Sequence, residues 1–328
     1  MIFVYLGHWS TVHAGAFAYA FHLQLFFLVA GFFATNSIQR DINTWIKKLF
    51  FSLFLPYILW VLISFLFINI DNINVNRNDF KTILTAPSSM QPNYWFFPAF
   101  IAVVLVYFLL LKMIHRPEII FLISLVLHFL LGETPIISTT WMDVSLWPSI
   151  MQVVNNWIAF SAIPEFLFWY AMGAVVFGYV KKFVNMKEEK NPFFYMIGGF
   201  SGLVSFILFF KNLTDFAFIQ NIIYSNNFTF ELYMVMCSLI IITFIFFISK
   251  LLEESKVMND IGKNSMSFMG LEYITHGYFA LSFLPMINLG IPNITSTIHV
   301  ITIIIIQVEI NLFISRKINK YFPILNGK

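Results

Sequence analysis

The sequence predicts an all-α integral membrane protein, a polytopic bundle of about ten transmembrane helices. Two features of the composition support this prediction: 59% of the residues are hydrophobic and only 11% are charged. A typical soluble domain has about 25% charged residues, so a soluble protein of this composition would lack polar surface. The third observation is that the apolar residues form long stretches, most of which approach the roughly 17–25 residues that cross a bilayer.

Short polar segments separate the apolar stretches and set the helix boundaries. We expect helices at residues 1–14, 16–34, 49–70, 94–114, 118–132, 157–180, 193–210, 232–250, 267–285 and 298–315. The first and the fifth are short for a membrane span. No polar segment is long enough to form a second domain, so residues 1–328 are expected to form a single transmembrane domain.

Lys and Arg residues are distributed unequally between alternate connecting segments. If the N-terminus is cytoplasmic, 16 of the 19 basic residues lie on the cytoplasmic side. The other 3, Arg77, Lys81 and Lys211, lie on the far side of the membrane. Cytoplasmic loops of membrane proteins carry an excess of Lys and Arg. We therefore expect both termini in the cytoplasm.

The composition disfavours several kinds of partner and site. No basic patch is interleaved with aromatic residues, so a nucleic-acid partner is not expected. The single cysteine, Cys237, lies in an apolar run and is expected to pack in the bundle. No CxxC or HExxH spacing occurs, so the sequence predicts no metal site.

Ionisable residues inside predicted spans are candidates for function, because a charge at bilayer depth is costly. They are His8, His22, His128, Glu165, Glu272, His276 and Glu309. His8 is a candidate general base, since neutral imidazole can be buried and protonated near pH 7; an interhelical hydrogen bond is the alternative. Glu165 is either a substrate ligand or an interfacial carboxylate. Glu272 and His276 share a helix face and are expected to satisfy each other, whereas a structural role is expected for His128.

Two further features bear on substrate binding. His22 opens an apolar run near the far-side end of its helix, where it faces the same cavity as His8 or makes a structural hydrogen bond. The cytoplasmic loop from Arg40 to Lys47 and Lys48 is basic and amphipathic enough to lie on the membrane surface. The positive charge of this loop is either an ordinary positive-inside signal or part of a binding site for a polyanionic ligand. Lysines suit the second role because they act as point charges toward phosphate.

Short motifs in a fixed order give the sequence a family resemblance. They are LGH at 6–8, FHLQLFF at 21–27 with AGF at 30–32, the lysine pair at 47–48 with LPY at 55–57, YWFFPA at 94–99, GKNS at 262–265, YITH at 273–276 and YFP at 321–323. Together they resemble membrane acyltransferase family 3, over nearly the whole chain. The nearest branch resembles fucose 4-O-acetylase-like proteins.

Two departures from the family pattern stand near the N-terminus. The family usually has a basic residue upstream of the helix-one histidine, but only seven residues precede His8 here, so we expect a truncated or misassigned start. Gln24 stands where the family often has proline, which is expected to change only a local bend.

The resemblance implies a membrane O-acyltransferase, most often an O-acetyltransferase, in the bacterial cytoplasmic (inner) membrane. Such enzymes move an acyl group from acyl-CoA, usually acetyl-CoA, to a hydroxyl of a cell-surface glycan or its lipid-linked precursor. Acyl-CoA is then a co-substrate, and no permanently bound cofactor is expected. The resemblance implies that the catalytic base is His8. The implied binding residues are Arg40, Lys47 and Lys48 for the CoA phosphates and His22, Trp95 and Glu165 for the acceptor side.

Two alternatives stay open at this point. Buried histidines and glutamates would also serve a proton-coupled transporter or a flippase of glycan precursors, although no inverted repeat or pair of broken helices is evident. The missing basic position before His8 is compatible with a catalytically inactive relative.

Overall fold

The computed structural model is all-helical over the part of the chain that it describes, with no strand among those residues. It describes residues 21–34, 41–68, 96–131, 152, 162–184, 192–210, 227–278 and 297–328. The α-helices are α3 (His22–Gly31), α4 (Ile42–Leu49), α5 (Leu55–Ile68), α8 (Phe96–Ile114), α9 (Pro117–Leu131), α11 (Ile163–Val184), α12 (Pro192–Phe210), α14 (Asn227–Leu251), α15 (Lys256–Lys263), α16 (Ser265–Tyr278) and α18 (Thr297–Tyr321). The predicted all-α class is confirmed.

Several of these helices have the length and apolar character of membrane spans. Those long enough to cross a bilayer are Ile42–Phe67, Phe96–Ile114 and Phe228–Leu251. Shorter apolar helices cover His22–Gly31, Pro117–Leu131, Ile163–Phe177 and Tyr195–Ile207. Large apolar side chains such as Phe33, Met113 and Phe200 are exposed over more than half of their surface, as lipid contact requires. These features are those of a helical membrane bundle, and the total of about ten spans stays a prediction.

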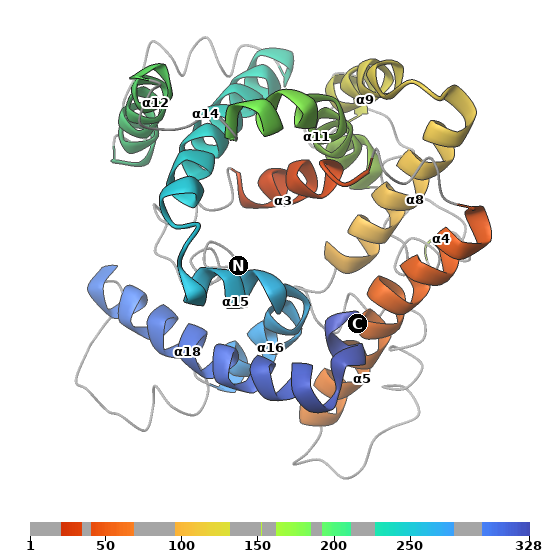
Figure 1. Cartoon of the computed structure of the whole chain (residues 1–328), viewed down its shortest axis with the longest axis vertical. Coiled ribbons are helices and arrows are strands. Elements are labelled where there is room, and N and C mark those ends of the chain that lie inside the picture. The colour runs from red at the N-terminus through yellow and green to blue at the C-terminus, as the bar shows by residue number, and fades with distance from the viewer. Residues whose placement is uncertain are drawn as a thin grey trace.

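The helices pack around two apolar cores (Figure 1). One core lies among α3, α8, α9, α11 and α14, with Phe27 and Trp169 fully buried in it. The other lies where α5 packs against α16 and α18, around Tyr57, Trp60 and Leu271. Helix α8 contributes to both cores, because Phe96 packs in the first and the adjacent Phe97 in the second. Helix α12 lies at one side of the bundle against α14.

Helices α3 and α11 approach each other closely at two glycines. A Cβ added to Gly31 would collide with the carbonyl oxygen of Tyr170, and one added to Gly173 would collide with that of Leu28. Small residues at a crossing let the backbones of membrane helices come together. Nearer the start of both helices, Phe27 stacks on Phe166 with ring centroids 4.4 Å apart. The middle and end of α3 therefore lie against the first turns of α11.

The predicted cytoplasmic loop before the expected helix at 49–70 is wrong in part, because residues 42–49 form α4. The Asp41 carboxylate caps this helix by accepting a hydrogen bond from the backbone N–H of Thr44 at 3.1 Å, which is a stabilising helix start. A π-helical turn at Phe50–Phe54 joins α4 to α5. The predicted amphipathic character is confirmed: Trp45 is buried and stacks on Phe108 of α8, while both Lys47 and Lys48 are exposed.

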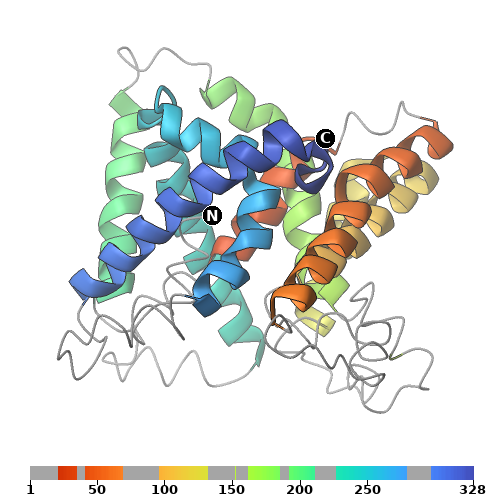
Figure 2. The ribbon, with the colours of Figure 1, turned by 90° about the horizontal axis from the view of Figure 1, so that it is seen from below.

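The C-terminal residues fold back against α5 and the α15–α16 junction (Figure 2). The indole N–H of Trp60 donates to the carbonyl oxygen of Leu325 at 2.9 Å. The side-chain amide of Asn326 donates to the carbonyl oxygen of Lys263 at 3.0 Å and accepts from the backbone N–H of Ser267 at 3.3 Å. These bonds satisfy groups that the short turn between α15 and α16 leaves free.

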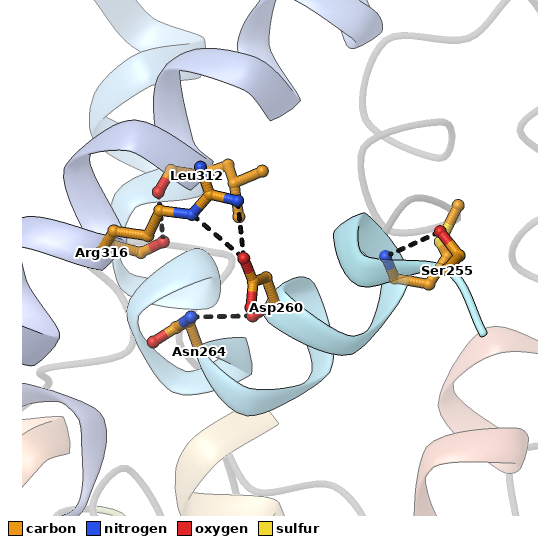
Figure 3. A network of polar contacts seen from close by, with 7 residues as sticks. Ser255, Asp260, Asn264, Leu312 and Arg316 are labelled. Carbon is orange, nitrogen blue, oxygen red and sulfur yellow. Dashed lines mark hydrogen bonds and ion pairs between the residues drawn. The ribbon is translucent and has the colours of Figure 1, made fainter. Parts of the chain in front are cut away.

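Helix α15, which the sequence analysis did not predict, is held against α18 by an ion pair (Figure 3). The Arg316 guanidinium donates to the Asp260 carboxylate through Nε at 3.1 Å and Nη2 at 2.6 Å. Asn264 donates to the backbone carbonyl of Asp260 at 2.8 Å, and Ser255 caps the helix start. The hydroxyl of Ser315, the residue before Arg316, bonds within α18 to the Leu312 carbonyl.

Candidate functional site

Three ionisable side chains from three helices converge inside the first core. His128 lies in the last turn of α9, Glu165 in the first turn of α11, and Glu231 near the start of α14. Nδ1 of His128 is 3.2 Å from Oε2 of Glu165, and its Nε2 is 3.0 Å from Oε1 of Glu231. One ligand atom of each residue lies within 4.8 Å of the other two. We call these three residues the His–Glu–Glu cluster.

The cluster is shielded from solvent by aromatic rings. The His128 side chain is fully buried, and those of Glu231 and Glu165 are 7% and 14% exposed. The imidazole stacks on Phe168 with centroids 4.7 Å apart and meets Trp169 edge-on at 6.5 Å. Electrostatic interactions are stronger in such surroundings than in water, because the local dielectric is low. The cluster can therefore hold a proton or a cation tightly.

Helix geometry explains why α11 supplies both a carboxylate and the ring walls. Glu165, Phe168 and Trp169 are separated by three and four residues and so share one face of α11. That face packs against α9, one of the main contacts in the fold. His128 therefore meets the carboxylate and the aromatic rings from a single neighbouring helix, and Glu231 is added from α14.

The cluster lies at one end of its helices, and the basic residues that flank these helices lie at the other end. Helix α9 starts just after Arg116, about 16 Å along the helix axis from His128 at 1.5 Å per residue. Helix α14 has Lys250 in its last turn, whereas Glu231 lies near its start. The sequence analysis placed these basic residues on the cytoplasmic side, which would put the cluster toward the far side.

The structure describes three of the other predicted site residues. His22 begins α3 and is 9% exposed. Lys47 and Lys48 are exposed in the last turn of α4. Trp45 of α4 stacks on Phe108 of α8, and α4 therefore lies near the basic end of α8. The remaining predicted residues, His8, Arg40 and Trp95, lie outside the described residues.

A second set of buried polar residues links α16 to α18. The side-chain amide of Gln307 donates to the Thr275 hydroxyl at 2.9 Å and to the Glu272 carbonyl at 3.3 Å. Asn311 also donates to the Thr275 hydroxyl, at 3.1 Å. Such bonds hold membrane helices together. The expected contact between Glu272 and His276 stays a prediction, since the His276 side chain lies outside the described part of the structure.

Cys237 and Glu309 were also singled out from the sequence. Cys237 is buried and free, as its apolar sequence context predicted. Glu309, two residues after Gln307, is exposed on α18. Neither residue joins the His–Glu–Glu cluster.

Sequence reasoning named Glu165 but missed its partners. His128 was interpreted as a structural residue, and Glu231 fell one position before the predicted span at 232–250. The signal that was available is positional: if the predicted helices alternate in direction, all three residues fall at far-side ends. Which helix ends meet in space depends on packing, so spacing along the chain alone could not pair them.

The fold and the cluster define a helical membrane protein with an ionisable centre inside its bundle. The chain belongs to acyltransferase family 3: the family model, described as an acyltransferase domain, matches residues 1–308. The predicted family is thereby confirmed, and the chain is a membrane acyltransferase. The fucose 4-O-acetylase-like branch stays a prediction. No curated protein and no solved structure was found to match the chain.

Proposed function

We propose that this chain is an O-acyltransferase of the bacterial cytoplasmic membrane that moves an acetyl group from acetyl-CoA to a hydroxyl of a surface glycan or its lipid-linked precursor. The observation that carries the proposal is the family match over residues 1–308. It spans His8 and all of the other proposed binding residues. The apolar helices described above support a location in the membrane, with both termini cytoplasmic according to the distribution of Lys and Arg.

The proposed reaction is direct acyl transfer with His8 as the general base. The acceptor hydroxyl oxygen attacks the thioester carbonyl carbon while His8 takes the hydroxyl proton. The tetrahedral intermediate then collapses, the C–S bond breaks, and the thiolate of CoA receives a proton from His8. The products are the O-acyl glycan and CoA. A positioned base contributes about 10²–10⁴-fold in rate, and positioning of both substrates supplies much of the remainder.

The donor is proposed to bind on the cytoplasmic side, at α4. Lys47 and Lys48 are exposed and stand beside the basic end of α8 through the Trp45–Phe108 stack. An exposed pair of ammonium groups suits the phosphates of CoA. Arg40, which precedes the helix in sequence, is proposed to add a third charge.

The acceptor is proposed to bind toward the opposite side of the membrane, near the starts of α3 and α11. His22 and Glu165 lie in the first turns of these two helices, which pack together through the Phe27–Phe166 stack. Trp95 is proposed to stack on a sugar ring, because an indole offers a large flat apolar face with a polar edge.

Mass spectrometry of surface glycans tests this function in cells. Cells expressing the protein should carry glycans heavier by one acetyl group than cells lacking the gene, and a His8→Ala variant should match the deletion. His115→Asn is the matched control, because His115 is exposed with φ 58° between α8 and α9 and asparagine tolerates that backbone conformation. Identical glycan masses with and without the gene would contradict the proposal, and vesicle uptake of a glycan precursor without acyl-CoA would favour a transporter.

A further inference from the structure

We propose that the His–Glu–Glu cluster binds one divalent transition-metal cation, such as Zn²⁺ or Mn²⁺, through His128, Glu165 and Glu231. Imidazole and carboxylate together are ligands that these ions accept in proteins. This proposal is independent of the acyl-transfer proposal, because it follows from the arrangement of three side chains. It predicts that the protein binds an ion, whatever reaction the protein carries out.

The first argument is the distance between the two carboxylates. If His128 were a simple imidazolium donating a linear hydrogen bond from each ring nitrogen, the two acceptor oxygens would be about 8 Å apart, because the two N–H bonds point in nearly opposite directions. Instead, an oxygen of Glu165 and an oxygen of Glu231 lie within 4.8 Å of each other. One oxygen of each carboxylate is thus close enough to the other for a single ion between them to contact both.

The second argument is the geometry at the imidazole. Carboxylate oxygens lie 3.0 and 3.2 Å from its two nitrogens, but within the described part of the chain neither oxygen lies close to the direction of a ring N–H bond. Two ligand atoms that are each about 2.1 Å from one ion are about 3.0 Å apart in octahedral coordination and about 3.4 Å apart in tetrahedral coordination. The Nε2 to Glu231 distance of 3.0 Å therefore fits shared coordination.

The third argument is charge. Two carboxylates beside one imidazole form a set of ligands whose charge a divalent cation can balance. A divalent cation brings the three side chains to zero, which is the favoured state for ionisable groups inside a bilayer.

The bound ion would join α9, α11 and α14 at one point. Three protein ligands also leave at least one coordination position for water or a hydroxyl group, because catalytic zinc sites typically have four ligands. If the acyl-transfer proposal also holds, Glu165 contributes to the acceptor side through this ion.

Metal binding to the purified full-length protein tests the site directly. After removal of metal with a chelator, the protein in detergent should bind one equivalent of Zn²⁺ in competition with a fluorescent indicator. Glu165→Gln and Glu231→Gln should each weaken this affinity at least 10-fold while keeping the side-chain shape. Glu272→Gln is the matched control, because it removes a buried carboxylate from another part of the bundle and should leave the affinity unchanged.

A second measurement needs only the wild-type protein, in case a variant does not fold. Pulsed electron paramagnetic resonance of the Mn²⁺-loaded protein should detect coupling to one histidine nitrogen. Absence of stoichiometric Zn²⁺ and Mn²⁺ binding to the wild type would overturn the site. Wild-type affinity in both glutamine variants, or a Mn²⁺ signal without nitrogen coupling, would overturn it as well.

Discussion

Lys47 and Lys48 are the two residues of the proposed donor site that the structure describes. Both are exposed in the last turn of α4, whose apolar side is anchored by Trp45. An exposed charge pair contributes at most about 1 kcal/mol, because water screens it. Each lysine should therefore contribute only modestly to the binding of CoA.

Replacing these lysines tests that contribution. In Lys47→Gln and Lys48→Gln, KM for acetyl-CoA should rise up to about fivefold per residue with kcat nearly unchanged, since the lost contact is equal in ground and transition states. Steady-state transfer assays at varied acetyl-CoA measure this. Lys256→Gln, an exposed lysine at the start of α15, serves as control, and an equal rise in its KM would argue against a specific donor site at α4.

At the scale of residues, the sequence predicted single members of the site better than their grouping. Glu165 stood out because a carboxylate within an apolar stretch is costly. His128 did not, since a lone histidine in a leucine-rich helix has many structural explanations. Only the packing of α9 against α11 and α14 shows that the two glutamates converge on it.

At the scale of elements, the crossing of α3 and α11 is a contact that a single added methyl group would disrupt. Gly31 and Gly173 face backbone carbonyls of the partner helix, which cannot move aside as a flexible side chain can. Because His22 and Glu165 begin these two helices, the crossing also positions the proposed acceptor side.

Alanine substitution tests this crossing. Gly173→Ala should destabilise the protein by about 1–3 kcal/mol through overpacking, measured as a lower unfolding midpoint in detergent. Gly199→Ala in α12 is the control: nothing lies within 4 Å of the added Cβ, so alanine should be neutral or stabilise by up to about 1 kcal/mol. If Gly173→Ala were as stable as the wild type, the close approach of α3 and α11 would be wrong.

Some apolar helices were predicted within a few residues of their observed bounds, because the length of an apolar stretch is set by the bilayer thickness. Helix α8 was expected at 94–114 and is found at Phe96–Ile114. The short helices α4 and α15 were missed, since each has only eight residues and a largely exposed polar face. Their caps, Asp41 and Ser255, were the available signals.

At the scale of the whole molecule, the cluster and the basic helix flanks define two opposite ends of the bundle. This polarity agrees with the positive-inside distribution, and it predicts which connections face the cytoplasm. In a Cys237→Ser background, Arg116→Cys and Lys256→Cys should be protected from a membrane-impermeant maleimide in intact cells, whereas Lys211→Cys should react. Labelling of Arg116→Cys before the cells are opened would reverse the proposed orientation.

The central claim is that the protein moves an acetyl group from acetyl-CoA to a glycan hydroxyl with His8 as the base. The most direct measurement uses purified protein in lipid vesicles with acetyl-labelled CoA and a cell-surface glycan fraction, and follows label in the glycan. Wild-type protein should transfer the label, and His8→Ala should be slower by about 10²–10⁴-fold while His115→Asn keeps wild-type rate. Transfer by His8→Ala at the wild-type rate, or no transfer by the wild type, would contradict the claim.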